Sequence, residues 1–263
     1  TVDGFDWGAH WVDGAEGNPR APLIRRVGLQ SLFVGGDSTY TGGWRDLAIH
    51  IPGRRPLSEA ERLTSILLTD EFFEALESWR NRSAAEEPDM ALGDFLARFI
   101  SQRGLDSAAA AMLTWHITLL ARDDCSGGLE LVSARSWDEG YAVYGAGDST
   151  IAGGFAQITE RLAAGLDIRL EHEVSSISHE EGAPVEVVAG GQTFKADYLL
   201  VTVPLGVLKA GCIRFLPPLP AAKQQAIARL GFGSLAKLRV LFETPFWPRE
   251  QYVFGLLSRG ASE

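Results

Sequence analysis

The spacing of apolar residues changes along the chain, and this change most limits what the chain can fold into. Between residues 58 and 122 apolar residues recur every three or four positions, as on one face of a helix. Ser58 and Glu61 have the spacing of a capping box, which satisfies the first free amides of a helix. We therefore expect an all-helical stretch with helices at roughly 58–82, 90–103 and 106–122.

The rest of the chain alternates between helical and β-type patterns. Asn18-Pro19 is typical of a helix start, and this helix is expected to end near Gly28. Further helices are expected at 155–165 and 219–230. Short β-type runs are expected at 31–34, 46–51, 167–170, 174–177, 185–188, 192–194, 198–203 and 237–243. Gly190-Gly191 is a hairpin turn signal. These patterns predict a mixed α+β or α/β fold with a mixed sheet and flanking helices.

Composition excludes several classes of protein. The chain has 263 residues, is 46% hydrophobic and 22% charged, and carries a formal net charge of -10, so it reads as globular rather than disordered. No basic stripe is present, so a nucleic-acid partner is not expected. No apolar run approaches the length that crosses a membrane, so no membrane partner is expected. Two distant cysteines predict no disulfide framework.

The common catalytic motifs give little support for metal or nucleophile chemistry. The five histidines show no ligand spacing, so no metal site is expected, and neither a G-x-S-x-G elbow nor a Walker A loop is present. Gly231–Ala236 matches the dinucleotide-binding pattern G-x-G-x-x-A. However, that pattern works after a strand and before a helix, whereas here a helix is expected before it and a strand after it. We interpret this match as a false positive.

Two groups of residues keep alternative interpretations on sequence grounds alone. Lys237 heads an alternating run and is read either as a solvated strand residue or as a functional amine. Trp7, Trp11 and Trp44 are read either as core or as walls of a site for a planar ligand. From the residues alone, the prediction therefore goes no further than a glycine-rich α+β chain with a candidate site for a flat ligand.

Four segments together resemble the flavin-dependent amine oxidases, a family that includes monoamine oxidases, polyamine oxidases and lysine-specific histone demethylases. DGFDWGAHWVDG (3–14), followed by Asn18-Pro19, resembles the family's D-x-G-A-x-W-x-x-G…NP segment. The other three are GGFAQITERLAAGLDIRLEHEVSSI (153–177), ADYLLVTVPLGVLKAGCIRFLPPLPAAKQQAI (196–227) and GFGSLAKLRVLFETPFWP (231–248). Their order and spacing match the family across nearly the whole chain, although residues 30–140 resemble it only loosely.

The resemblance implies two interleaved domains. Residues 1–19 and 148–215 correspond to part of an FAD-binding domain. Residues 20–147 and 216–263 correspond to part of a substrate-binding domain, with the helical insertion at 58–122. Family members also have an N-terminal G-x-G-x-x-G loop and a C-terminal flavin segment that this sequence does not contain. We therefore expect an internal portion of an amine oxidase, whose partners include the missing segments or a second copy of the chain.

The resemblance also implies roles for particular residues. Gly8, Ala9, His10 and Trp11 match the loop beside the isoalloxazine ring, and Val174 matches the residue whose backbone pairs with the adenine. Thr202, Val203 and Pro204 match a turn near the adenosine end, and Lys237 matches the active-site lysine that holds a water near flavin N5.

The expected activity is FAD-dependent oxidation of an amine, with dioxygen as second substrate and hydrogen peroxide as product. The class of amine (polyamine, monoamine or amino acid) is left open, and a cytoplasmic location is expected. The alternative from another class is a flavin-free, inactive module that serves as a scaffold or binding surface, and we expect the isolated chain to be inactive.

Overall fold

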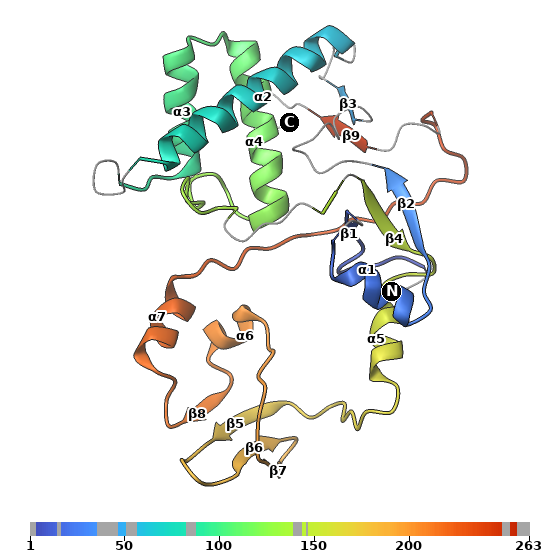
Figure 1. Ribbon diagram of the computed structural model, residues 1–263, viewed down its shortest axis with the longest axis vertical. Coiled ribbons are helices and arrows are strands. Elements are labelled where there is room, and N and C mark those ends of the chain that lie inside the picture. The colour runs from blue at the N-terminus through green and yellow to red at the C-terminus, as the bar shows by residue number, and fades with distance from the viewer. Residues whose placement is uncertain are drawn as a thin grey trace. The chain divides into compact units, whose positions relative to one another are not determined.

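The computed structural model describes residues 4–14, 17–35, 47–50, 57–82, 88–138, 144–145, 147–248 and 253–256. The chain divides into two compact units. Unit 1 comprises Thr1–Ala164 and Ser234–Glu263, and unit 2 comprises Gly165–Gly233. Both contain helices and strands, which confirms the predicted mixed fold (Figure 1). No helix among the described residues is long and apolar enough to cross a membrane.

Three helices form the largest part of unit 1, as the apolar spacing predicted. They are α2 (Glu59–Arg80), α3 (Leu92–Arg103) and α4 (Ser107–Cys125). The capping box at Ser58 is present, with reciprocal bonds between the Ser58 and Glu61 side chains and backbone amides. Asp106 caps α4 by accepting from the amides of Ala108 and Ala109. These local bonds explain why the helix boundaries were predictable to within three residues.

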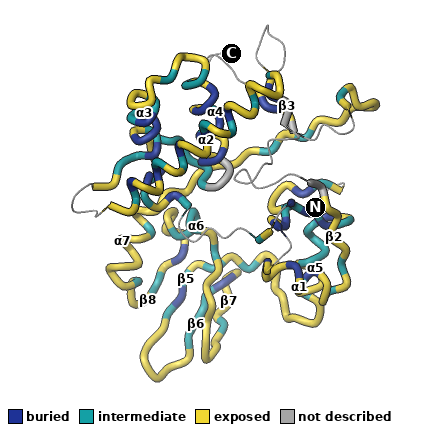
Figure 2. The backbone as a smooth tube through the Cα atoms, turned by 45° about the horizontal axis from the view of Figure 1, so that its top comes forward, coloured by how far each residue is buried: buried dark blue, intermediate teal, exposed yellow. Residues whose placement is uncertain are grey.

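The core of unit 1 lies between these helices. On α2 the buried residues Thr69, Phe72, Leu76 and Trp79 recur at helical spacing and form a stripe. The Phe72 ring packs edge-on against two rings of α3. Figure 2 shows the buried stretches of α2, α3 and α4 facing one another. The main cluster consists of Phe72, Leu76, Trp79, Leu92, Phe95, Leu96, Phe99, Leu113, Ile117, Leu120, Ala121, Val132, Ala134 and Trp137.

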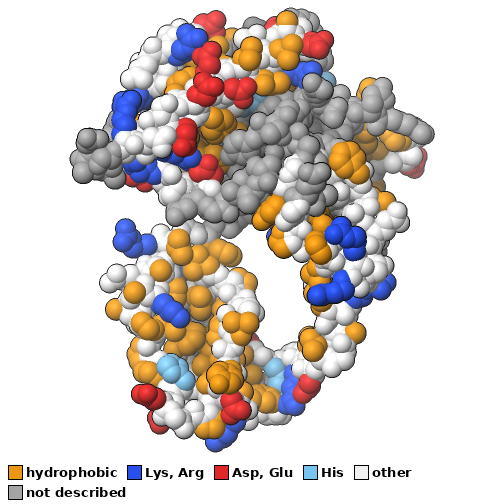
Figure 3. Space-filling view, viewed as in Figure 1, with side chains coloured by type: hydrophobic (Ala, Val, Ile, Leu, Met, Phe, Trp, Pro, Cys, Tyr) orange, Lys and Arg blue, Asp and Glu red, His pale blue; other side chains and the backbone are white. Residues whose placement is uncertain are grey.

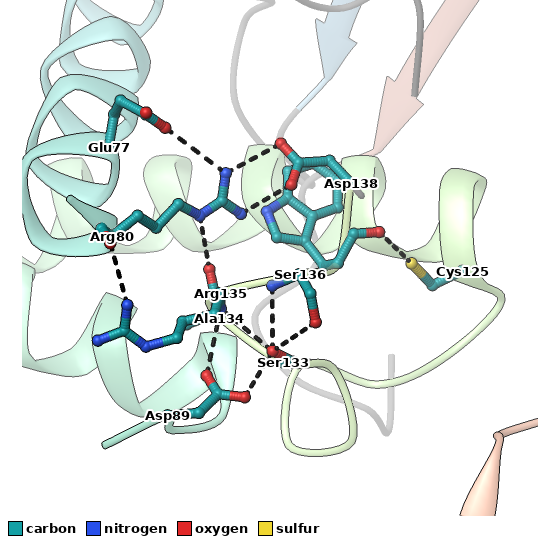
Figure 4. A network of polar contacts seen from close by, with 10 residues as sticks. Glu77, Arg80, Asp89, Cys125, Ser133, Ala134, Arg135, Ser136 and Asp138 are labelled. Atoms are coloured by element: carbon teal, nitrogen blue, oxygen red, sulfur yellow. Dashed lines mark hydrogen bonds and ion pairs between the residues drawn. The ribbon is translucent and has the colours of Figure 1, made fainter. Parts of the chain in front are cut away.

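A polar network joins the C-terminal end of α2 to the segment that follows α4 (Figure 4). Arg80 donates from Nε to the carbonyl of Ala134 at 2.9 Å and forms an ion pair with Asp138 at 2.8 Å. The Asp89 carboxylate accepts from the Ser133 hydroxyl at 2.6 Å. The guanidinium of Arg135 lies 4.5 Å above the Trp79 ring. These contacts fix residues 133–138 to the C-terminal end of α2 and to the segment before α3.

The remaining elements of unit 1 form two small sheets and two short helices. Strand β4 (Asp148–Ile151) pairs antiparallel with both β1 (Val12–Asp13) and β2 (Ser31–Gly35), while β3 (Leu47–His50) pairs parallel with β9 (Val253–Leu256). Helices α1 (Arg20–Arg26) and α5 (Ala156–Ala163) confirm two expected helices. Val12, Ile24 and Ile151 are buried together and join this sheet to α1.

Unit 2 is a four-stranded sheet with two helices. The strand order is β7-β6-β5-β8, with β5 (Val174–Ser178), β6 (Val185–Ala189), β7 (Gln192–Ala196) and β8 (Arg214–Leu216). Gly190 and Gly191 make the predicted hairpin turn with φ angles of 55° and 76°. In the chain, helix α6 (Leu205–Ala210) lies between β7 and β8, and helix α7 (Ala221–Arg229) follows β8. Helix α7 confirms the helix expected at 219–230.

Three expected strands are wrong. Residues 167–170, 198–203 and 237–243 have irregular backbone, although their apolar content is high. A strand requires a neighbour for its backbone hydrogen bonds, and among the described residues none pairs with these runs. Their side chains are accordingly exposed: Tyr198 is 92% and Leu238 88% exposed. In Figure 3 hydrophobic side chains gather over the visible face of unit 2.

Candidate functional site

Lys237 lies against the glycine-containing loop near the start of the chain. Its Nζ atom contacts the main-chain carbonyl of Asp6 at 3.1 Å, the carbonyl of Gly8, and Nδ1 of His10 at 2.8 Å. All of these residues belong to unit 1. The structure therefore brings Lys237 to two other predicted site residues, Gly8 and His10, which lie 229 and 227 positions before it in the sequence.

Aromatic contacts hold the loop and the lysine segment in this arrangement. The His10 and Trp11 rings are 4.5 Å apart, and the Phe5 and Trp7 rings pack edge-on at 5.0 Å. The guanidinium of Arg239, two residues after Lys237, lies 5.5 Å from the Phe5 ring. The segment that carries Lys237 is therefore fixed to the loop at two positions.

Asp6 is a site residue that the sequence analysis did not identify. It is buried, and its Oδ2 accepts from the backbone amide of Phe155 at 2.9 Å, at the start of α5. Its carbonyl is one of the acceptors of Lys237. The sequence nevertheless contains a signal for Asp6. It places a carboxylate inside an aromatic, apolar run, and a carboxylate is buried only where hydrogen bonds satisfy it.

A hollow of about 390 Å³ opens beside this loop within unit 1. Gly8 and Ala9 line it, and a Cβ atom placed on Gly8 would meet no atom within 4 Å. The loop thus presents exposed backbone to open space, as a site for a planar ligand requires. The remaining lining residues come from the loop, α1 and the start of α5: Asp6, Arg20, Leu23, Ile24, Phe155, Ala156, Ile158 and Thr159.

The other predicted site residues lie in unit 2. Val174 is the first residue of β5, where it pairs with Ala189. Thr202 and Val203 lie in the irregular segment before α6, and Pro204 is the residue that precedes its first turn. Their predicted role at the adenosine end stays a prediction.

The tryptophans and the Gly231 motif can now be placed. Trp7 is 49% exposed and Trp11 is half-buried beside His10, so neither is a fully buried core residue, while Trp44 lies outside the described residues.

Gly231–Ala236 follows α7 and precedes irregular backbone, so no helix N-terminus stands behind it. A phosphate-binding turn needs that helix, and the false-positive interpretation therefore holds.

Comparison with known proteins defines the class. A search of solved structures finds cyclohexylamine oxidase from Brevibacterium oxydans IH-35A at a TM-score of 0.61 and 21% identity, covering 85% of this chain and 52% of that one. At this identity the match shows the fold alone, which is that of a flavin amine oxidase. The family model described as flavin containing amine oxidoreductase matches residues 4–263, and the chain belongs to this family.

Curated relatives agree with this family. Polyamine oxidase 2 of Arabidopsis thaliana is 32% identical over 254 residues, which cover 94% of this chain and 51% of the relative. Polyamine oxidase 4 of rice (Oryza sativa subsp. japonica) is 30% identical over 260 residues, covering 96% and 52%. Lysine-specific histone demethylase 1 homolog 2 of Arabidopsis thaliana is 41% identical over 157 residues, covering 59% and 21%. The chain spans about half the length of the polyamine oxidases it matches.

Proposed function

We propose that the complete protein containing this chain oxidises an amine to an imine with bound FAD and passes the electrons to dioxygen, releasing hydrogen peroxide. The substrate class is a polyamine, a monoamine or an amino acid. One observation carries the proposal: Lys237 is fixed on the exposed loop of Gly8 and His10, beside an open hollow. This is the arrangement that the family resemblance implies for an active-site lysine next to a planar ring.

The loop residues fit one end of such a cofactor. Gly8 to Trp11 would lie along the flavin ring, because the backbone at Gly8 faces open space and a planar group needs close backbone approach. Val174 and Thr202 to Pro204 would contact the adenosine end, as the resemblance implies. When bound, the flavin supplies the hydride acceptor and the electron path to dioxygen.

The chain's own side chains would position the reacting groups and favour the reactive protonation state of the substrate. Lys237 Nζ contacts three acceptors, and an ammonium donates three hydrogen bonds and accepts none. A lysine that donates in this way has no lone pair with which to attack a substrate, which argues against a nucleophilic role. An apolar wall such as the half-buried Trp11 would favour the neutral form of the substrate amine, which is the form that reacts.

A second candidate, a flavin-free scaffold or binding module, is favoured by one observation. Among the described residues the Gly231–Ala236 run is not followed by a helix, and it therefore supplies no anchor for a pyrophosphate. The visible absorbance of purified residues 1–263, recorded after addition of excess FAD and desalting, separates the two. Retained flavin bands favour cofactor binding by the chain itself, and a colourless product favours the scaffold.

The catalytic role of Lys237 is tested by Lys237→Met in the complete, flavin-loaded protein. We expect reoxidation of the reduced flavin by dioxygen to slow at least about tenfold, because a charge-assisted hydrogen-bond donor is lost. Stopped-flow absorbance measures this step separately from flavin reduction by the amine. Lys209→Met is the matched control, since Lys209 also donates to a main-chain carbonyl, that of Ala228 at 3.1 Å, but in unit 2. Equal rates in both variants and the wild type would contradict the role.

A further inference from the structure

The hydrogen-bonding capacity of Lys237 is fully used within the protein. Its ammonium has three N–H donors, and three protein acceptors surround it: two main-chain carbonyls, of Asp6 and Gly8, and Nδ1 of His10. No N–H of Lys237 is then left for a water molecule. A water-holding role for this lysine requires one of the three acceptors to withdraw.

The three acceptors differ in how easily they withdraw. The carbonyls of Asp6 and Gly8 belong to the loop backbone, which Asp6 anchors through its bond to the amide of Phe155. His10 contacts Lys237 through a side chain, which moves by rotation about its own bonds without displacing the loop. Its ring lies in a half-buried position beside Trp11. His10 is therefore the acceptor whose release leaves the loop backbone in place.

The contact links the tautomer of His10 to the charge of Lys237. An ammonium cannot accept a hydrogen bond, so beside an ammonium Nδ1 of His10 accepts at 2.8 Å and the ring carries its proton on Nε2. A protonated ring would place a second cation beside Lys237 and would offer no acceptor there. The bond therefore forms only with a neutral ring in this tautomer.

We propose that His10 is a positioning residue that accepts the third N–H of Lys237, and that Lys237 binds water only when the His10 ring turns away. The consequence for catalysis rests on the proposed function, whereas the contact itself does not. Local sequence patterns do not indicate this hydrogen bond, because the two residues are 227 positions apart.

Competitive acetylation tests the contact without any flavin. The chain has four lysines, so Lys195, Lys209 and Lys223 serve as references inside the same molecule, and mass spectrometry measures the relative labelling of each. His10→Phe keeps a ring beside Trp11 but removes the acceptor, whereas His10→Asn keeps an acceptor at nearly the same place. We expect labelling of Lys237 to rise about tenfold in His10→Phe, because one bond fewer must break before the nitrogen reacts, and to stay near the wild-type value in His10→Asn.

Two results would overturn the contact: no change in His10→Phe, or an equal rise in both variants, which would mean that ring packing and not the acceptor matters. The wild-type protein provides a test that needs no variant. Nitrogen-15 NMR of the five histidines should place the His10 proton on Nε2. A proton on Nδ1 would refute the proposal.

A double-mutant cycle tests the catalytic consequence in the complete, flavin-loaded protein. His10→Phe should accelerate flavin reoxidation severalfold in the Lys237 background and leave the rate unchanged in the Lys237→Met background. An effect of the same size in both backgrounds would show that His10 does not act through Lys237. If labelling responds as expected and Lys237→Met has normal kinetics, the proposed function of the lysine fails while the contact stands.

Discussion

Gly14 and Gly104 share one backbone conformation but differ in their surroundings. Both have φ near +65°, in the left-handed region that side chains disfavour. A Cβ on Gly104 would meet nothing within 4 Å, whereas a Cβ on Gly14 would lie 1.9 Å from the carbonyl oxygen of Tyr144. Gly14 therefore allows a close backbone approach just after β1, while Gly104 only ends α3.

Substitution by alanine separates the cost of a left-handed backbone conformation from the cost of a steric clash. Gly104→Ala is expected to lower the free energy of unfolding by about 1 kcal/mol, the cost of the left-handed conformation alone. Gly14→Ala adds a clash with rigid backbone and is expected to cost about 3 kcal/mol or more. Urea unfolding of both variants measures the difference. Equal losses would show that the approach of Tyr144 to Gly14 is not tight.

At the residue scale the candidate site was only partly predictable. The resemblance identified Gly8, His10 and Lys237, and the structure brings these together. Asp6 and Phe5 were missed, since their contacts to Lys237 and Arg239 join segments that are distant in sequence. Local patterns carry no information on which carbonyl a distant lysine will meet, and the pairing appears only once the chain is folded.

At the element scale, two bidentate arginine–carboxylate pairs anchor helices, one pair in mostly buried surroundings and the other at the exposed surface. Arg80 and Asp138 have side chains that are 16% and 29% exposed, whereas Arg103 and Glu71 are 56% and 45% exposed. The hydrogen bond and charge of Arg103 lower the pKa of Glu71. Solvent weakens such attraction at the surface, so exposure and not geometry should decide which pair stabilises the helical core.

The same substitution in both pairs tests this expectation. Arg80→Met leaves Asp138 and the carbonyl of Ala134 without their donor in a mostly buried place, and it should lower the free energy of unfolding by about 2 kcal/mol. Arg103→Met is the control and should change stability little. Denaturant titrations followed by circular dichroism measure both. A larger loss in Arg103→Met would contradict the argument.

Helices were predicted better than strands for a physical reason. The signals for α2, α3 and α4 are local: apolar spacing, the cap residues Ser58 and Asp106, and the stop at Gly104. A strand depends on a partner elsewhere in the chain. Strands β4, β8 and β9 were missed for that reason, and the runs 167–170, 198–203 and 237–243 were mistaken for strands. Helix α6 was also missed, because the resemblance suggested only a turn there.

At the scale of the whole molecule, buried His116 makes stability depend on pH. The side chain is 1% exposed on α4, and burial lowers its pKa to about 4 from the ordinary 6.5. The folded state therefore keeps the ring neutral where the unfolded chain is protonated. Below pH 6.5 the unfolded state binds more protons, so stability falls as the pH falls toward 4 and is complete above 6.5.

This dependence is measurable by unfolding at two pH values. Proton linkage through His116 should lower the free energy of unfolding by about 2 kcal/mol between pH 7 and pH 5. His116→Leu should remove that part of the dependence, whereas His179→Leu, at an exposed position, should leave it unchanged. An identical pH dependence in wild type and His116→Leu would contradict the linkage.

The central claim about the whole molecule is that the loop from Asp6 to Trp11 and Lys237 form the flavin-facing side of an amine-oxidising site. The most direct test is anaerobic addition of an amine to the complete, flavin-loaded protein, with polyamines, monoamines and amino acids tried in turn. We predict that one class bleaches the visible bands of the oxidised flavin, and that admitted dioxygen restores them with release of hydrogen peroxide. Flavin that stays oxidised with every amine would contradict the claim.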